Sequence, residues 1–89
     1  MIGKIARSTA GHDIGQLYIV VGESASQVHL SDGRLKPVES PKIKNRKHVV
    51  ILNKKTDPSL RDKIISGDKA ANEAIKRAIK LYNREEENV

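Results

Sequence analysis

The chain has 89 residues, no cysteine and a formal net charge of +6. This length suits one small domain, and the lack of cysteine excludes disulfides and thiolate metal ligands and favours a reducing compartment. No apolar run is long enough to span a bilayer and no signal-peptide pattern is found, so a soluble, cytoplasmic protein without membrane contact is expected.

The positive charge is unevenly placed. Residues 1–56 hold ten Lys and Arg against four acidic residues, whereas residues 57–89 hold seven of each sign. Such a surplus is expected where one part of a chain binds a polyanion, although many small solvated domains are also basic.

Residues 4–21 carry the alternation of two β-strands. KIARS alternates loosely, with Ile5 as the expected inward side chain. Leu17, Ile19 and Val21 then form the apolar side of a second strand, because they recur at every other position.

A glycine loop separates these two strands. Gly11 and Gly15 bracket the polar pair His12 and Asp13. The loop is either an ordinary hairpin connection in which Asp13 makes an Asx turn, or a loop whose bare backbone can approach a ligand.

A second hairpin is predicted around Asp32 and Gly33, since both residues tolerate the positive φ of a two-residue turn. QVHLS and RLKPV would be its strands, with Leu30 facing Leu35 across the pair. Pro37 cannot donate to a ladder and would mark the end or the edge of the strand.

The segment ESPKIKNR then reads as a basic connection, and HVVILN reads as a last buried strand. About five short strands within residues 1–55, joined mostly by tight turns, predict a mainly β domain. The expected form is a small barrel that closes its own edges.

The character of the chain changes to helical over residues 56–89. Asp57 and Pro58 are a helix start, Gly67 is a helix stop, and Asp68 can cap a second helix.

An apolar stripe at three- and four-residue spacing follows in the second helix. We expect two C-terminal helices that pack on the barrel, or a helix over 69–84 that is free for a protein partner. The stripe consists of Ala71, Ala74, Ile75, Ala78, Ile79 and Tyr82.

The stretch GKIARSTAGHDIGQLYIVVG resembles a KOW motif, with an entering strand, a G-x-D-x-G turn and an apolar strand that ends in glycine. The resemblance continues through LSDGRLKPVESPK and KIKNRKH and covers residues 2 to about 55. The chain is similar to KOW-domain RNA-binding proteins related to the large-subunit ribosomal proteins of archaeal and eukaryotic type. This resemblance implies an SH3-like β-barrel that binds ribosomal RNA or the transcription machinery, with Gly15 as the glycine that defines the motif and Gly11 as the earlier turn glycine.

The basic run before the last strand is the second candidate for contact with RNA. Lys42, Lys44, Arg46 and His48 are spaced by two, so in an extended conformation they would project from one side. The alternative is a solvated connection, which is what most charge runs are. The full set of candidate RNA-binding residues is Arg7, Gly11, His12, Gly15, Arg34, Lys36, Lys42, Lys44, Arg46, Lys47 and His48.

Other site types have little support. The barrel holds one aromatic residue, Tyr18, so it cannot stack several bases, and structured RNA is the better ligand. The three histidines share no metal-ligand spacing, and no serine or carboxylate has an obvious catalytic partner, so no metal, no cofactor and no enzymatic activity are expected.

The sequence therefore predicts an RNA-binding module that contacts structured ribosomal RNA or the ribosome through a basic face and a glycine loop. The alternative is a protein-interaction module that docks on the transcription or ribosome-assembly machinery. The lack of groove aromatics argues against binding of proline-rich peptides in that second case.

Overall fold

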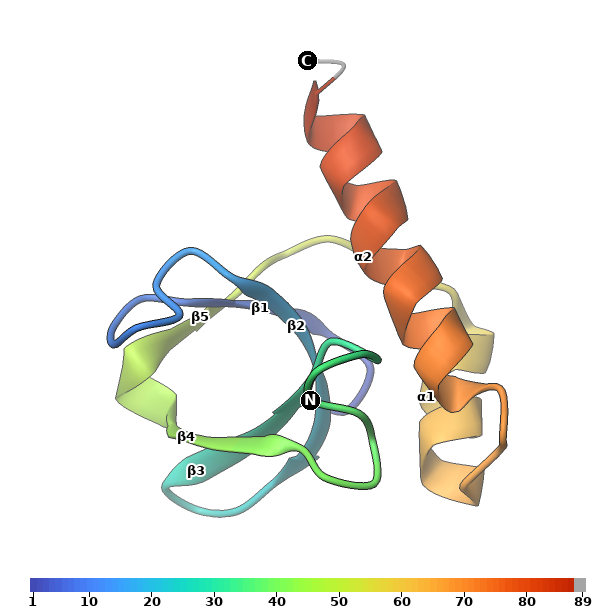
Figure 1. Ribbon diagram of the computed structural model, residues 1–89, viewed down its shortest axis with the longest axis horizontal. Coiled ribbons are helices and arrows are strands. Elements are labelled where there is room, and N and C mark those ends of the chain that lie inside the picture. Colours follow the sequence, from blue (N-terminus) through green and yellow to red (C-terminus); the bar gives the residue numbers. More distant parts are fainter. Residues whose placement is uncertain (88–89) are drawn as a thin grey trace.

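The computed structural model describes the backbone of residues 1–87 and the side chains of residues 1–86. Within this part, five strands are followed by two α-helices, and a short 3₁₀ helix precedes the last strand (Figure 1). The elements are β1 (Ile5–Ser8), β2 (Leu17–Glu23), β3 (Gln27–Ser31), β4 (Lys42–Asn45), η1 (Arg46–His48), β5 (Val49–Ile51), α1 (Pro58–Ser66) and α2 (Ala71–Glu87).

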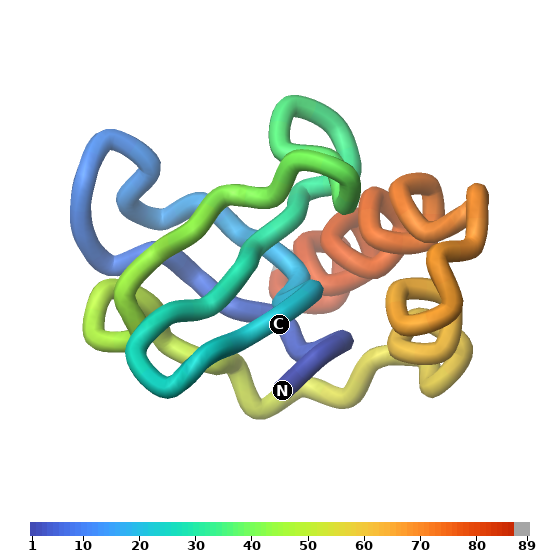
Figure 2. The backbone as a smooth tube through the Cα atoms, turned by 90° about the horizontal axis from the view of Figure 1, so that it is seen from below, coloured from blue at the N-terminus to red at the C-terminus, as the bar shows by residue number. Residues whose placement is uncertain are grey.

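The five strands form one antiparallel sheet in the order β4-β3-β2-β1-β5. The sheet curls strongly, and the two helices lie together on one side of it (Figures 1 and 2). No ladder joins β4 to β5 in the described residues, so the expected closure into a barrel does not occur. The reason is local: η1 turns the chain after Asn45, and Val49 pairs with Ser8 of β1.

The number of strands was predicted correctly, but the hairpin around Gly33 was wrong. The partner of β3 is β4, with Leu30 opposite Lys42, and residues 32–38 contain no strand. Instead, the Asp32 carboxylate accepts the backbone N–H groups of Arg34 and Lys36, both at 2.9 Å. These bonds fold the segment into a compact loop, because they take up the amides that a ladder would need.

Both faces of the curled sheet are buried. On the inside of the curl, Tyr18 and Val20 of β2 pack with Val28, Leu30 and Ala6. The opposite face carries Ile5 and Ile19, which pack against the helices. The strand β2 therefore contributes to two cores, since Tyr18 and Val20 are buried on one face and Ile19 on the other.

The capping signals of the first helix are confirmed. Asp57 accepts a hydrogen bond from the Ser59 N–H, Pro58 begins α1, and Gly67 ends it with a left-handed backbone. A Gly at this position avoids the steric cost of a Cβ at positive φ. No helix in the described part is long and apolar enough to cross a membrane.

The second helix packs on the sheet through its apolar stripe. Ala71, Ile75 and Tyr82 are buried, and Ile75 and Tyr82 contact the core of Ile5 and Ile19. The side chain of Asn72 also joins the helix to the loop before β4, since it accepts the Val38 N–H at 2.8 Å. This face of α2 is thus already in contact within the chain.

Candidate nucleic-acid interface

The glycine loop is held by one carboxylate. Asp13 accepts hydrogen bonds from the hydroxyls of Ser8 (2.9 Å) and Tyr18 (2.8 Å) and from the Lys44 ammonium (2.7 Å), and it forms an ion pair with Lys42 (3.1 Å). We call these five residues the Asp13 cluster. Two of its members lie on β4, so the cluster fastens the loop between β1 and β2 to the far edge of the sheet.

Apart from Lys42, the side chains of the Asp13 cluster are largely shielded from solvent. The side chains of Asp13 and Lys44 are only 11% and 10% exposed. Burial raises the pKa of Asp13, but hydrogen bonds from Lys44, Tyr18, Ser8 and Lys42 outweigh it and hold this pKa well below its usual value. Burial, together with the hydrogen bond to the Asp13 carboxylate, raises the pKa of the Tyr18 hydroxyl above its usual value. Asp13 is therefore a charged residue with a structural role. Within the described residues its carboxylate contacts side chains only, so the Asx turn considered from the sequence is not formed.

The basic run does not form the expected row of free cations. Lys42 and Lys44 project to one side, but that side is occupied by Asp13. The extended conformation ends at Asn45, and Arg46 in η1 pairs with Glu23 at 2.8 Å and donates to the Ser24 carbonyl. Three of the expected phosphate contacts are thus engaged within the protein, because the few acidic residues of the β domain lie where these cations can reach them.

The two loop glycines have different surroundings. Both have positive φ, +90° at Gly11 and +88° at Gly15. A Cβ on Gly11 would lie 3.4 Å from Lys44 Nζ, whereas a Cβ on Gly15 would meet nothing within 4 Å. Gly11 therefore gives room to the Asp13 cluster, whereas Gly15 is exposed and its N–H donates to the Ser8 carbonyl at 2.8 Å. His12 is exposed beside them.

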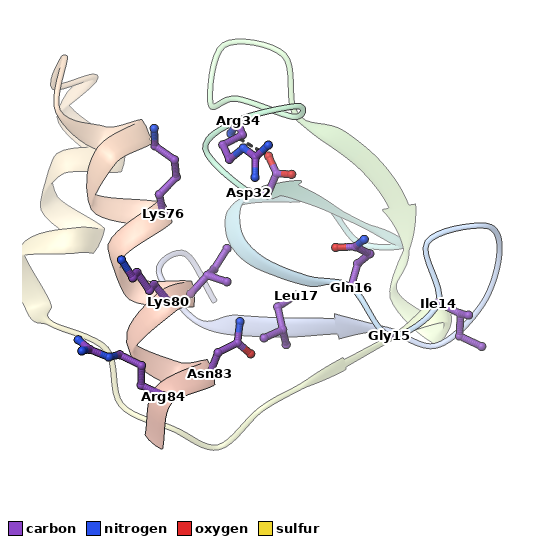
Figure 3. A pocket seen from close by; sticks show the side chains of 11 residues that line it. Ile14, Gly15, Gln16, Leu17, Asp32, Arg34, Lys76, Lys80, Asn83 and Arg84 are labelled. Carbon is purple, nitrogen blue, oxygen red and sulfur yellow. Dashed lines mark hydrogen bonds between the residues drawn. The ribbon is translucent and has the colours of Figure 1, made fainter. Parts of the chain in front are cut away.

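A groove of about 760 Å³ opens between the sheet and α2 (Figure 3). The sheet side supplies Gly15, Gln16 and Leu17 at the start of β2 and the pair Asp32 and Arg34 from the compact loop. The helix side supplies Lys76, Ile79, Lys80, Asn83 and Arg84. We call this surface the α2 groove. Its apolar side chains lie among side-chain amides and cations, a combination suited to a polyanion that also carries hydrogen-bonding groups.

The cations of the α2 groove are freer than those of β4. Lys76 pairs with Glu73 at 2.6 Å on the helix surface, but Arg34, Lys80 and Arg84 form no ion pair with any described side chain. Asp32 is the one acidic residue that lines the groove within the described part, and its carboxylate is occupied by backbone amides.

Sequence reasoning missed the contribution of α2 to this groove. The net charge of residues 57–89 is zero, and this total does not show how the charges are distributed around the helix. Lys76, Lys80 and Arg84 are spaced by four, which places them on one face of a helix, and this spacing was the signal. On another face Glu85 pairs with Lys54 of the linker before α1.

The remaining candidate residues lie apart from the groove lining. Arg7 is half-buried on β1, Lys36 is exposed on the compact loop next to the groove, and Lys47 and His48 are exposed on η1. Of the eleven candidate residues, the structure brings only Gly15 and Arg34 to the α2 groove. Among the described residues no group of three His, Cys, Asp or Glu side chains is arranged to hold a metal ion.

Comparison of the chain with models of protein families and with curated proteins gave no match. We therefore infer a function from the residues of this chain. The two main observations are the internal pairing of Lys42, Lys44 and Arg46, and the three groove cations Arg34, Lys80 and Arg84 that pair with no described side chain.

Proposed function

We propose that this protein is a cytoplasmic RNA-binding module of the KOW type, that its ligand is structured RNA, most simply ribosomal RNA, and that it binds without catalysis. The α2 groove is the contact surface in this proposal. The observation that carries it is a set of three cations, Arg34, Lys80 and Arg84, which form no ion pair with any described side chain and line both sides of one groove that also includes the exposed Gly15.

The electrostatics of the two basic surfaces support this choice. Binding of a phosphate to Lys44 would require its separation from Asp13, and a buried charge left without its partner is costly. Binding of a phosphate to Lys80 or Arg84 requires no such exchange with a described residue. Release of counterions from the RNA then supplies the favourable free energy.

The spacing of the helix cations also suits a phosphate backbone. Lys76, Lys80 and Arg84 rise along α2 by about 6 Å per step, because each residue adds about 1.5 Å. This step is close to the separation of successive phosphates in a nucleic-acid strand. Gln16 and Asn83 lie in the same groove and are amides that can bond to sugar hydroxyls or base edges.

The strand order and the curl of the sheet support a relationship to the SH3-like barrel that the KOW resemblance implies, although β4 and β5 are not paired in the part of the chain that the structure describes. Consecutive strands β1 to β4 are antiparallel neighbours, and β5 returns to lie beside β1. The strongly curled sheet packs its inner side chains into a core of Ala6, Tyr18, Val20, Val28 and Leu30.

A titration of binding against salt tests the proposal. With about three to four phosphates neutralised, the plot of log K against log salt for a structured RNA should have a slope of roughly −3. The double variant Lys80→Ala, Arg84→Ala should bind more weakly, and its slope should be smaller in magnitude by about 2.

The matched control is Arg61→Ala, Lys69→Ala, which removes the same charges from exposed positions outside the groove. It should leave the slope nearly unchanged. A flat salt response of the wild-type protein would refute RNA binding, and equal losses in the two double variants would refute the α2 groove as its site.

A further inference from the structure

The most exposed large apolar side chain among the described residues is Leu35, at 81%. The sequence pattern had predicted that it would pack against Leu30, but Leu30 is fully buried and Leu35 lies at the tip of the compact loop over residues 32–36. A single exposed leucine is ordinary on a protein surface. The loop that carries Leu35 has three further properties that favour a role in binding.

The first property is rigidity. Asp32 Oδ1 accepts the N–H groups of Arg34 and Lys36, and the Asp32 N–H donates to the Lys36 carbonyl at 3.1 Å. The Gly33 N–H donates to the buried Ser31 hydroxyl at 3.0 Å. The backbone N–H groups on either side of Leu35, those of Arg34 and Lys36, are therefore bonded, so the backbone of the loop is fixed while the Leu35 side chain is exposed.

The second property is attachment to α2. Gly33 is buried against the helix, and a Cβ at this position would lie 2.4 Å from the Asn72 carbonyl oxygen. Asn72 also accepts the Val38 N–H and donates to the Glu39 carboxylate. The base of the loop is thus fixed to the helix that supplies the cations of the α2 groove.

The third property is charge. Leu35 lies between two exposed cations, Arg34 and Lys36, and Arg34 itself lines the α2 groove (Figure 3). An apolar side chain flanked by cations suits a ligand that has apolar faces between regularly spaced anions, and an RNA with an unstacked base is such a ligand.

The protein has no exposed aromatic residue for that base. Phe and Trp do not occur in the chain, and both tyrosines are buried, Tyr18 at 5% and Tyr82 at 8% exposure. Stacking on an aromatic ring is the usual way in which proteins hold an unstacked base. An outward aliphatic side chain is the alternative, and apolar wedges of this kind insert at distorted base steps in other nucleic-acid complexes.

We propose that Leu35 packs on an unstacked base, so that the preferred ligand is an RNA helix interrupted by a bulge. Arg34 and Lys36 bind the phosphates on either side of that base. This inference depends on the proposed function and narrows it to one class of structured RNA.

Two RNA duplexes test the inference, one continuous and one with a single bulged 2-aminopurine. The wild-type protein should bind the bulged duplex about tenfold more tightly, which corresponds to about 1.4 kcal/mol, and should change the fluorescence of the probe. Leu35→Ala should bind both duplexes equally, with an unchanged salt slope, because an apolar contact releases no counterions. Leu35→Met should keep the preference.

The matched control is Ile65→Ala, which shortens another exposed aliphatic side chain, 56% exposed on α1 and away from the groove. It should behave as the wild type. If Leu35→Ala keeps the preference for the bulged duplex, or if the wild type shows no preference, the inference is refuted while RNA binding stands. If neither duplex binds in a salt-dependent manner, the proposed function fails instead.

Discussion

Replacement of Asp13 by Ala should strongly destabilise the protein. The Lys44 side chain is 10% exposed, and its ammonium has two partners at 2.7 Å, Asp13 Oδ1 and the Ala10 carbonyl oxygen. Without the carboxylate, this buried cation keeps only the neutral carbonyl, and the Tyr18 hydroxyl loses the acceptor at 2.8 Å. Removal of one partner of a buried pair costs about 3–5 kcal/mol.

That loss is large for a domain of this size. A stability of roughly 0.05–0.15 kcal/mol per residue gives the 89-residue chain about 4–13 kcal/mol in total. Urea unfolding followed by far-ultraviolet circular dichroism should therefore show a much lower midpoint for Asp13→Ala, with a similar slope. The matched control is Asp62→Ala, since Asp62 is exposed on α1; the change there should be within about 0.5 kcal/mol.

A second variant tests the assigned cause. Lys44→Met in the Asp13→Ala background removes the unpaired cation and should recover part of the lost free energy of unfolding. Lys44→Met alone should destabilise the protein, because it leaves the Asp13 carboxylate with fewer hydrogen-bond donors. A cost below about 1 kcal/mol for Asp13→Ala, or additive effects of the two changes, would contradict the account of the Asp13 cluster.

Three further outcomes are expected. The pKa of Asp13 is lowered in the folded state, so its contribution to the free energy of unfolding is complete above the unfolded pKa of about 3.9 and is lost as the pH falls below that value. The urea midpoint should therefore drop more steeply in acid for the wild type than for Asp13→Asn. The pKa of Tyr18 is raised in the folded state, so its contribution to the free energy of unfolding is complete below about pH 10 and is lost as the pH rises further. In Tyr82→Phe, where Tyr18 is the remaining tyrosine, phenolate absorbance should appear only above the usual pH range of tyrosine. Gly33→Ala should lower the free energy of unfolding by more than 1 kcal/mol, since φ is +75° and the new Cβ would approach the helix backbone to 2.4 Å; a thermal midpoint equal to that of the wild type would exclude this packing.

The sequence alone determined the local elements whose signals do not depend on distant residues. Alternating apolar residues specified β1 and β2, and the helix signals at Asp57, Pro58 and Gly67 specified the limits of α1. These features follow from side-chain periodicity and from the capping of backbone groups, which a few neighbouring residues settle.

The tertiary structure decided the strand pairing and the state of the charges. The chain does turn at Gly33, but the hydrogen bonds of Asp32 close the segment into a loop instead of a hairpin. The strand that pairs with β3 is β4, which lies in the segment interpreted as a basic connection. Ion pairs between residues far apart in the chain depend on which strands become neighbours, so the engagement of Lys44 by Asp13 could not be deduced from charge counts. The same reason explains the α2 groove, because a neutral sum over the helical segment says nothing about which helix face lies beside the sheet.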